Sequence, residues 1–345
     1  MIRFRLLFSV LTLLVLGYVA FWYWAAAEAE DALKRFARER ANVGERVDFD
    51  AIRRTGFPYR VELHLENLRI DSLTPFPWSA HAAEFIVQTQ TWSPRHIILK
   101  VPSGEMRFAN ARPRREEPFP VRFERLSASA ILDAGGLAEL TVSPERITWM
   151  SSDETLFEGG PLVLAVLLTE EENLSGEDPT SLLEPRLARL GLRAESLELR
   201  SGVMAQLGPE VTRLIGDISL RGQSWPRFTR ASLADWRDRG GTLEIDRLEG
   251  DWSGLSVAAN GSLTVDSALR PLGAVSADVG DIAVFIDRLA ESGSLSRDQA
   301  EAAKRFFAMM QAAGAAKEPI RLPLGFQDGM MSLGPVPIWP LEPLL

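Results

Sequence analysis

The sequence predicts a mainly β protein with a few helices: an N-terminal transmembrane helix, an antiparallel and curved β-sheet body, and two helices near the C-terminus. Three observations predict this fold class. An apolar run opens the chain, apolar and polar side chains alternate from Val47 onward, and a helical spacing of apolar residues returns beyond residue 280. With 345 residues, 46% of them hydrophobic, the chain can bury a sizeable core in one large or two ordinary domains.

Residues 1–27 form the predicted membrane anchor. Between Leu6 and Ala27 only Ser9 and Thr12 carry polar side chains, and a bilayer core of about 30 Å needs roughly 20 such residues as a helix. The membrane anchor residues that we expect to contact the bilayer include Leu6, Leu14, Trp22 and Trp24.

The charges that flank this run predict its orientation. Arg3 and Arg5 precede it and acidic residues follow it from Glu28, so we expect a single-pass inner-membrane protein with a cytoplasmic N-terminus and its bulk in the periplasm. The aromatic residues 21–24 fit an interfacial belt at the periplasmic side. The stretch "AAAEAE" also offers small residues for signal-peptide cleavage, so a cleaved secretory signal is the alternative interpretation, and both interpretations export the protein.

A juxtamembrane helix is predicted for residues 28–44. Apolar residues recur there at helical spacing, with charged residues between them. We expect this helix to continue the membrane helix and to pack a stripe of Leu33 and Phe36 on the first strands. Asn42 and Gly44 provide a signal for its C-terminal end.

A first β-rich half is predicted for residues 45–168. In "YRVELHLENLRI" the apolar side chains fall on every second position, and similar short segments follow with Pro, Gly, Ser or Asp between them, which is typical of an antiparallel meander. In the segment "GGPLVLAVLLTE" every residue from Leu162 to Leu168 is apolar, at odd-numbered and even-numbered positions alike. It fits a strand buried on both faces or a short helix, and we favour the strand.

An acidic loop and linker, residues 169–190, separates this half from a second β-rich half, residues 191–345. Its first part, Thr169 to Pro179, is acidic and interrupted by Gly and Pro, which is typical of an exposed loop. Strand patterns then resume, and "GTLEIDRLEGDWSGLSVAANGSLTVD" places apolar side chains at every second position. Segments of the two halves look alike, but no fixed repeat period holds.

Two helices and a hairpin are predicted near the C-terminus. The helices are expected at about 281–292 and 297–313, the second after a capping-box pattern of Ser296 and Gln299. Asp328-Gly329 predicts a two-residue hairpin turn, because both of its positions need a positive φ. This turn would gather apolar side chains on one face of the hairpin, which we take as the candidate apolar contact face: Leu324, Phe326, Met331 and Leu333.

Motifs that carry chemistry are absent from the sequence. It has no cysteine, which excludes disulfides, thiolate metal ligands and cysteine nucleophiles. The histidines His64, His81 and His96 lack metal-ligand spacing, and no phosphate-binding or nucleophile-elbow motif occurs. We therefore expect no cofactor, no metal and no enzyme, although a carboxylate pair that hydrolyses glycosides would leave no local motif. The net charge of −9 argues against nucleic acid as a partner.

Three phrases resemble a known family. "RTGFPYRVELHLENLRI", "PFPWSAHAAEFIVQTQTWSPRHIILKVP" and "RLPLGFQDGMMSLGPVPI" look like parts of the bacterial envelope proteins of domain-of-unknown-function family 2125, over nearly the whole chain after the anchor. The resemblance implies no settled activity and no catalytic residues. The anchored layout and "GDWSGLSVAANGSLTVD" are more weakly similar to AsmA-like proteins, which are anchored in the inner membrane and carry β-rich periplasmic parts linked to phospholipid transport and outer-membrane assembly.

Two functions of different classes follow as hypotheses. The first is an anchored periplasmic protein that binds phospholipid or acyl chains on an apolar sheet face in envelope maintenance, because burial of each CH₂ gives about 0.8 kcal/mol without any motif. The second is a scaffold or adaptor, without catalysis, that binds another envelope protein. Its candidate contacts are loops that carry tryptophan, a residue enriched at interfaces: Trp78, Trp92, Trp225, Trp236 and Trp339. The same alternation also suits any sheet that closes an ordinary core.

Overall fold

The computed structural model of the chain describes residues 2–72, 77–108, 119–151, 154–168, 184–201, 208–226, 229–291, 293, 296–312, 319–333 and 336–344. The chain divides into two compact units, Met1–Leu137 and Ala138–Leu345. Antiparallel strands dominate both units, and helices near the C-terminus accompany them, so the predicted fold class is confirmed. The division precedes the expected acidic loop, most of which, residues 169–183, lies outside the described residues.

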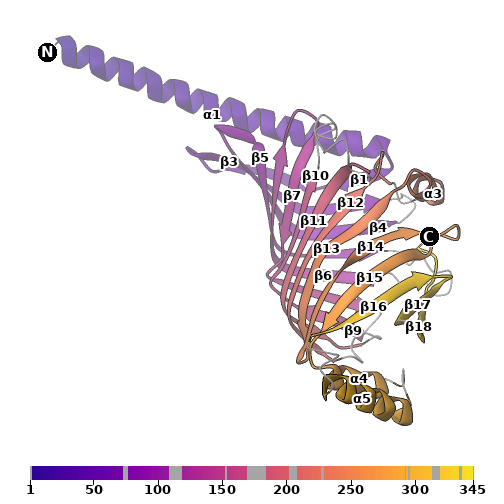
Figure 1. Ribbon diagram of the computed structural model, residues 1–345. Helices are drawn as coiled ribbons and strands as arrows, with labels where there is room; N and C mark the ends of the chain where they lie inside the picture. Colours follow the sequence, from indigo (N-terminus) through magenta and orange to yellow (C-terminus); the bar gives the residue numbers. More distant parts are fainter. Residues whose placement is uncertain are drawn as a thin grey trace. The chain divides into compact units, whose positions relative to one another are not determined.

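The first unit combines one long helix with an antiparallel sheet (Figure 1). Helix α1 (Ile2–Asn42) is continuous, so the predicted anchor and the predicted juxtamembrane helix are one element. Strand β3 pairs with β1, β2 and β4, and β4, β5 and β6 continue as a meander. The strands are β1 (Glu45–Asp48), β2 (Ala51–Thr55), β3 (Arg60–Ser72), β4 (Trp78–Gln90), β5 (Ser93–Phe108) and β6 (Phe119–Leu132).

One stripe of α1 packs on the apolar side chains of β3. Trp22 and Ala26 are buried there, and Leu33 extends the contact further along the helix. The Leu33 part of the predicted stripe is therefore confirmed. The Phe36 part is wrong, because Phe36 is 54% exposed. The contact advances by three or four residues at a time, so it continues from Leu33 to the half-buried Ala37 and turns Phe36 away from the sheet.

The second unit contains a longer antiparallel sheet whose strands bend along their length (Figure 1). The pairing runs in the order β7–β10–β11–β12–β13–β14–β15–β16–β17–β18, and β9 pairs with both β8 and β11. The strands are β7 (Leu137–Ser143), β8 (Arg146–Ser151), β9 (Glu154–Gly159), β10 (Leu162–Leu168), β11 (Arg186–Leu199), β12 (Glu210–Arg221), β13 (Thr242–Trp252), β14 (Leu255–Val265), β15 (Pro271–Val279), β16 (Ile320–Gln327), β17 (Met330–Leu333) and β18 (Val336–Pro340).

The doubly apolar segment "GGPLVLAVLLTE" forms the strand β10, as predicted. Burial on both faces is wrong, because Leu164 is 43% exposed and Leu167 is 51% exposed. These two side chains point to opposite faces of the sheet, since they lie an odd number of positions apart. The buried clusters of the described residues in this unit centre on other strands.

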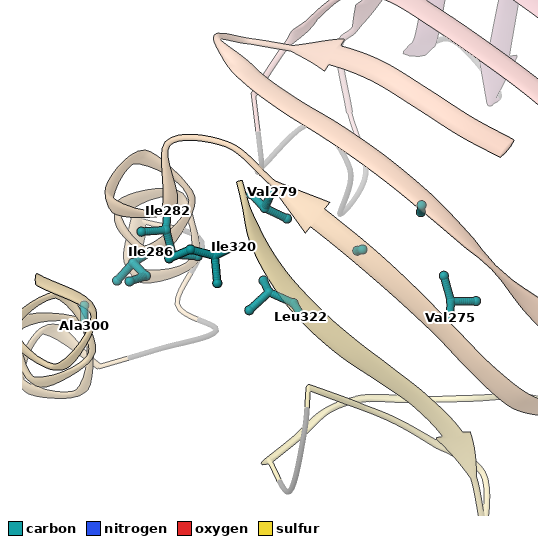
Figure 2. Close-up of a cluster of buried hydrophobic side chains, with 9 residues drawn as sticks. Val275, Val279, Ile282, Ile286, Ala300, Ile320 and Leu322 are labelled. Atoms are coloured by element: carbon teal, nitrogen blue, oxygen red, sulfur yellow. The ribbon is translucent and has the colours of Figure 1, made fainter. Parts of the chain in front are cut away.

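Helices α4 (Ile282–Glu291) and α5 (Arg297–Ala312) confirm the two predicted C-terminal helices. The capping box before α5 is also confirmed, because the Ser296 amide donates to Gln299 Oε1 (2.8 Å) and the Gln299 amide donates to Ser296 Oγ (3.2 Å). Figure 2 shows Ile282 and Ile286 of α4 directed toward Ile320 of β16, with Ala300 of α5 close by. The two helices thus cover one end of the sheet.

A further helix, α3 (Arg230–Asp238), was not predicted. Thr229 caps its N-terminus by accepting a hydrogen bond from the Ser232 amide. Trp236, which was expected in a loop, lies on this helix and is buried, and its Nε1 donates to the carbonyl oxygen of Arg221 over 2.8 Å. This core cluster also contains Ala188 and Leu220, so α3 packs on the ends of β11 and β12.

The C-terminal hairpin has the predicted register. Asp328 and Gly329 form the turn with φ values of 54° and 73°. Phe326 pairs with Met331, and the next pair on the same face is Leu324 with Leu333. The Asp-Gly turn therefore sets the pairing of β16 with β17, as the sequence indicates.

Candidate functional site

The sheet of the second unit carries one continuous apolar face. Directly paired residues of antiparallel strands project to the same side of a sheet, so the pairing register identifies the residues that share this face. Three rows of paired residues cross the strands, and we call them together the apolar face. The first row is Val142, Leu164, Leu192, Gly216, Leu248, Ala259, Ala277 and Leu322.

The other two rows run parallel to the first row and cross the same strands further along their length. The second row is Leu140, Val166, Leu190, Ile218, Ile245, Gly261, Val275 and Leu324. The third row is Leu168, Ala188, Leu220, Leu243, Leu263, Gly273, Phe326, Met331 and Trp339. Every member of the three rows is apolar or glycine, so the face is apolar from β10 to β18.

Helices cover only parts of the apolar face. The cluster around α4 and α5 includes side chains of β13 to β16, and the cluster around α3 includes the third row at β10 to β13. Among the described residues, neither cluster includes five side chains of β10 to β12 in the first two rows: Leu164, Val166, Leu190, Leu192 and Ile218. We call these five the open patch. Leu164 is exposed and the other four are half-buried, so the open patch retains apolar surface that water can reach.

The opposite face of this sheet is charged. Asp217 of β12 accepts hydrogen bonds from Arg189 of β11 (3.3 Å) and from Arg247 of β13 (3.0 Å). Farther along the sheet, Arg321 holds Asp278 through two contacts of 2.8 and 3.0 Å. The hydrogen bond from Arg321 lowers the pKa of the Asp278 carboxyl below its ordinary value. The sheet is therefore amphipathic, with one face suited to water and the other to apolar partners.

Side chains that resemble a catalytic arrangement occur on the polar face of the first unit. His64 Nε2 lies 3.0 Å from Thr55 Oγ1, and His64 Nδ1 lies 3.0 Å from Glu84 Oε1. The Thr55 hydroxyl also donates to Glu62 Oε2 over 3.1 Å. The four groups sit on the neighbouring strands β2, β3 and β4, and the threonine proton already has a carboxylate acceptor. We interpret this cluster as a cross-strand polar network that stabilises the sheet.

The other two histidines lie apart from this cluster. His96 Nε2 lies 2.8 Å from Ser129 Oγ on the neighbouring strand β6, and His81 is exposed. Within the described part of the chain, no group of three or more histidine, aspartate or glutamate side chains is arranged to hold a metal ion. The chemistry that the described surface offers is apolar contact.

The predicted contact face at the hairpin belongs to the apolar face. Leu324 and Phe326 lie in its second and third rows and pack against the cluster around α4 and α5. Met331 is half-buried, and the side chain of Leu333 lies outside the described residues. The role of the hairpin as a contact face stays a prediction. The sequence did not identify the open patch, because that patch depends on how β10, β11 and β12 pair.

The structure places the predicted anchor residues in two environments. Leu6, Leu14 and Trp24 are exposed on α1. Trp22, which we expected in the aromatic belt, is 4% exposed and donates from Nε1 to the carbonyl oxygen of Arg60 over 2.9 Å. It faces the sheet because it begins the stripe that packs on β3. In the described residues, α1 is the single helix that is long and apolar enough to cross a membrane, a test that a signal sequence also passes.

The tryptophans proposed as adaptor contacts also differ in environment. Trp92 and Trp225 lie outside helices and strands and are exposed, and Trp339 of β18 is exposed as well. Trp78 is half-buried at the start of β4, and Trp236 of α3 is buried against the sheet. Exposed tryptophan is therefore available at three of the five predicted positions.

Comparison with known proteins adds a family and nothing more specific. The family model for an uncharacterized protein conserved in bacteria (DUF2125) matches residues 22–342. No curated protein matches the chain, and no solved structure matches it. The resemblance to family 2125 is therefore confirmed, whereas the weaker resemblance to AsmA-like proteins receives no support from these comparisons.

Proposed function

We propose that this chain, which belongs to the DUF2125 family of bacterial proteins, is anchored in the inner membrane and binds the acyl chains of lipids on the apolar face of its second unit. The N-terminus would lie in the cytoplasm and both units in the periplasm. The protein would act in envelope maintenance as a binding protein and not as an enzyme. It would need no cofactor.

The membrane part of the proposal is supported by α1. Its first half exposes apolar side chains continuously, among them Leu6, Leu11 and Leu14, and exposed apolar surface of this extent is costly in water. Arg3 and Arg5 before the run and acidic residues after it favour a cytoplasmic N-terminus. The tight packing of the same helix on β3 favours retention of the helix in the mature protein over its removal as a signal peptide.

The single observation that carries the lipid part is the open patch within the apolar face. Acyl chains need apolar area and few directional contacts, because each buried CH₂ contributes about 0.8 kcal/mol. The rows of the apolar face cross β7 and β10 to β18 without a polar interruption, and the open patch is the part of them at β10 to β12 that lies outside the helix clusters. The charged opposite face disfavours the same ligand there.

Two leucines of one strand provide a matched test. Leu164 belongs to the open patch, whereas Leu167 of the same strand points to the opposite face, and both are exposed. We would place the full chain in nanodiscs that contain a phosphatidylglycerol with a photoactivatable diazirine in its acyl chain, and map the adducts by mass spectrometry. Adducts on α1 serve as the internal standard for the lipid that surrounds the anchor.

The expected result is adducts on β10 to β12 in the unaltered chain. Leu164→Asp should reduce these adducts about tenfold relative to those on α1, because a buried carboxylate in an acyl-chain site costs well over 1 kcal/mol. Leu167→Asp should leave them unchanged. Adducts on α1 alone in the unaltered chain would contradict the lipid proposal. An equal loss of the β10 to β12 adducts in the two variants would also contradict it.

The adaptor function remains a second candidate, because Trp92 and Trp225 are exposed outside helices and strands. Large exposed aromatic side chains are enriched in protein interfaces. Replacement of both tryptophans by serine should abolish capture of a defined envelope protein if the adaptor function holds. The same double variant should leave the lipid adducts on β10 to β12 unchanged.

A further inference from the structure

We propose that the turn between β2 and β3, residues 56–59, enters the interface of the same bilayer that α1 crosses. This gives the first unit a second membrane contact beside its helix. The inference rests on the membrane anchoring in the proposed function, and it is independent of the lipid site on the second unit. The occupant is the lipid headgroup region of the inner membrane.

The turn is fixed to α1 by aromatic and polar contacts. The ring centroid of Phe57 lies 5.5 Å from that of Trp22, edge to face, and 6.4 Å from that of Tyr18. The Tyr18 hydroxyl donates to the carbonyl oxygen of Pro58, and Trp22 Nε1 donates to that of Arg60. The turn therefore lies beside the helix at the level of residues 18–22. Its depth relative to the bilayer is set by the position of these residues of α1 in the bilayer.

The length of the exposed apolar part of α1 determines how deep residues 18–22 lie in the bilayer. From Phe4 to Phe21 the helix is about 27 Å long at a rise of roughly 1.5 Å per residue, which is slightly less than the bilayer core of about 30 Å. Beyond this point Trp22 and Ala26 are buried against the sheet and are unavailable to lipid. The bilayer core must therefore extend to the level of Trp22, where Phe57 lies, and the headgroup region reaches further along the helix.

The exposed side chains of the turn suit this environment. Phe57 is 52% exposed and Tyr59 is 71% exposed, and Phe21 and Trp24 of α1 are exposed at the same level. Tyr59 and Trp24, which combine an apolar ring with a polar tip, suit the membrane interface, and Phe57, which is wholly apolar, suits the adjoining edge of the bilayer core. A large aromatic pair exposed to water would be unfavourable on a periplasmic surface, whereas beside the anchor it adds to membrane contact.

The absence of cysteine from the chain allows a direct test with single-cysteine variants of the full-length protein. We would label Leu14→Cys, Phe36→Cys and Phe57→Cys with a small environment-sensitive fluorophore in nanodiscs of phosphatidylethanolamine and phosphatidylglycerol. Lipids that carry a spin label near the headgroup then quench fluorophores at the interface, at positions 57 and 36, and lipids that carry it deep in the acyl chain quench the fluorophore at position 14, near the middle of the span. Phe36 is the matched control, because it is an exposed phenylalanine of the same unit, 54% against 52%.

The label at position 57 should be quenched at least about twofold more strongly than the label at position 36, which lies about 22 Å beyond Phe21 along the helix. Quenching at position 14 with equal, weak quenching at 57 and 36 would overturn the second contact and leave the anchor intact. No quenching at position 14 would overturn the anchor and this inference together. If Phe57→Cys disturbs the packing on Trp22, Tyr59→Cys gives the same comparison.

Discussion

Trp22 of the N-terminal helix donates its indole Nε1–H to the backbone carbonyl of Arg60, the first residue of β3, over 2.9 Å. The indole is almost fully buried beside Val61 and Leu63. Tyr18, one turn earlier, already donates to the carbonyl oxygen of Pro58, and Trp22 is the first residue of α1 that is buried against the sheet. It links the apolar segment rigidly to the first sheet.

Replacement of Trp22 should loosen this link strongly. We expect Trp22→Ala to destabilise the first unit by about 3–5 kcal/mol, because a large buried aromatic side chain leaves a cavity. Trp22→Phe should cost about 1 kcal/mol, because it keeps most of the apolar area and loses one hydrogen bond. Hydrogen exchange of the β3 amides, with the chain in nanodiscs, measures both effects. Trp24→Ala is the control, because Trp24 is exposed, and a loss of protection equal to that in Trp22→Ala would contradict the assignment.

Gly261 lies in the second row of the apolar face and allows β14 and β15 to pair closely. A Cβ atom at this position would overlap the carbonyl oxygen of Ala274 and the Cα atom of Val275. Since both are backbone atoms, they can give way only if the strands separate. Gly261→Ala should therefore lower the stability of the second unit by roughly 1–3 kcal/mol.

Thermal unfolding compares this variant with Gly191→Ala. At Gly191 the nearest atom to an added Cβ is Ala165 Cβ at 3.6 Å, which is ordinary contact. We expect Gly191→Ala to leave the unfolding temperature within a degree or two of the parent. Equal losses in the two variants would show that glycine matters here through chain flexibility and not through the close approach of β14 and β15.

The hairpin turn gives a further prediction. Gly329 has a φ of 73°, a conformation that costs an L side chain about 1 kcal/mol. Gly329→Ala should lower stability by about that amount, whereas Asp328→Asn should change it little, because asparagine accepts a positive φ as readily as aspartate. Urea unfolding measures both, and a larger loss for Asp328→Asn would indicate that the carboxylate charge, and not the turn conformation, holds the hairpin.

Local sequence signals predicted those elements whose structure depends on near neighbours. The alternation of Val61, Leu63 and Leu65 predicted β3, and Asp328-Gly329 predicted the register of its hairpin. Helix α3 was missed because only Leu233 and Trp236 mark its apolar side within a polar segment. The Thr229 cap was a signal that could have indicated it.

The candidate site depends on contacts that no local pattern contains. Leu164 and Leu192 become neighbours only because β10 pairs with β11 across a long connection. A hydropathy pattern also cannot distinguish Trp22 from Trp24, because both are tryptophans of one apolar run. Trp22 faces β3, whereas Trp24 is exposed. Period-two alternation predicts that each strand has an apolar face, but the register between strands decides whether those faces join, and which part of the joined face the helices leave uncovered.

The pH dependence of stability should include a contribution from Asp266. Its Oδ1 accepts hydrogen bonds from the amides of Arg270 (2.9 Å) and Ala268 (2.8 Å), and its Oδ2 accepts one from the Arg270 side chain (2.7 Å). These bonds, the Arg270 amide first, lower the pKa of Asp266 below its ordinary value. A lowered pKa in the folded state means that this carboxylate stabilises the fold above its unfolded pKa, and that the stabilisation is lost as the pH falls through the folded pKa.

The unfolding midpoint of the parent chain should therefore fall more steeply with acid than that of Asp266→Asn, between about pH 5 and pH 2. Arg270→Gln separates the causes, because it removes the side-chain donor and keeps the backbone amide that contributes most. We expect it to retain a large part of the parent's acid dependence. If the unfolding midpoints of the parent and of Asp266→Asn depend on pH identically, the pKa of Asp266 is the same in the folded and the unfolded chain. That result would contradict the stabilising role assigned to the hydrogen bonds around its carboxylate.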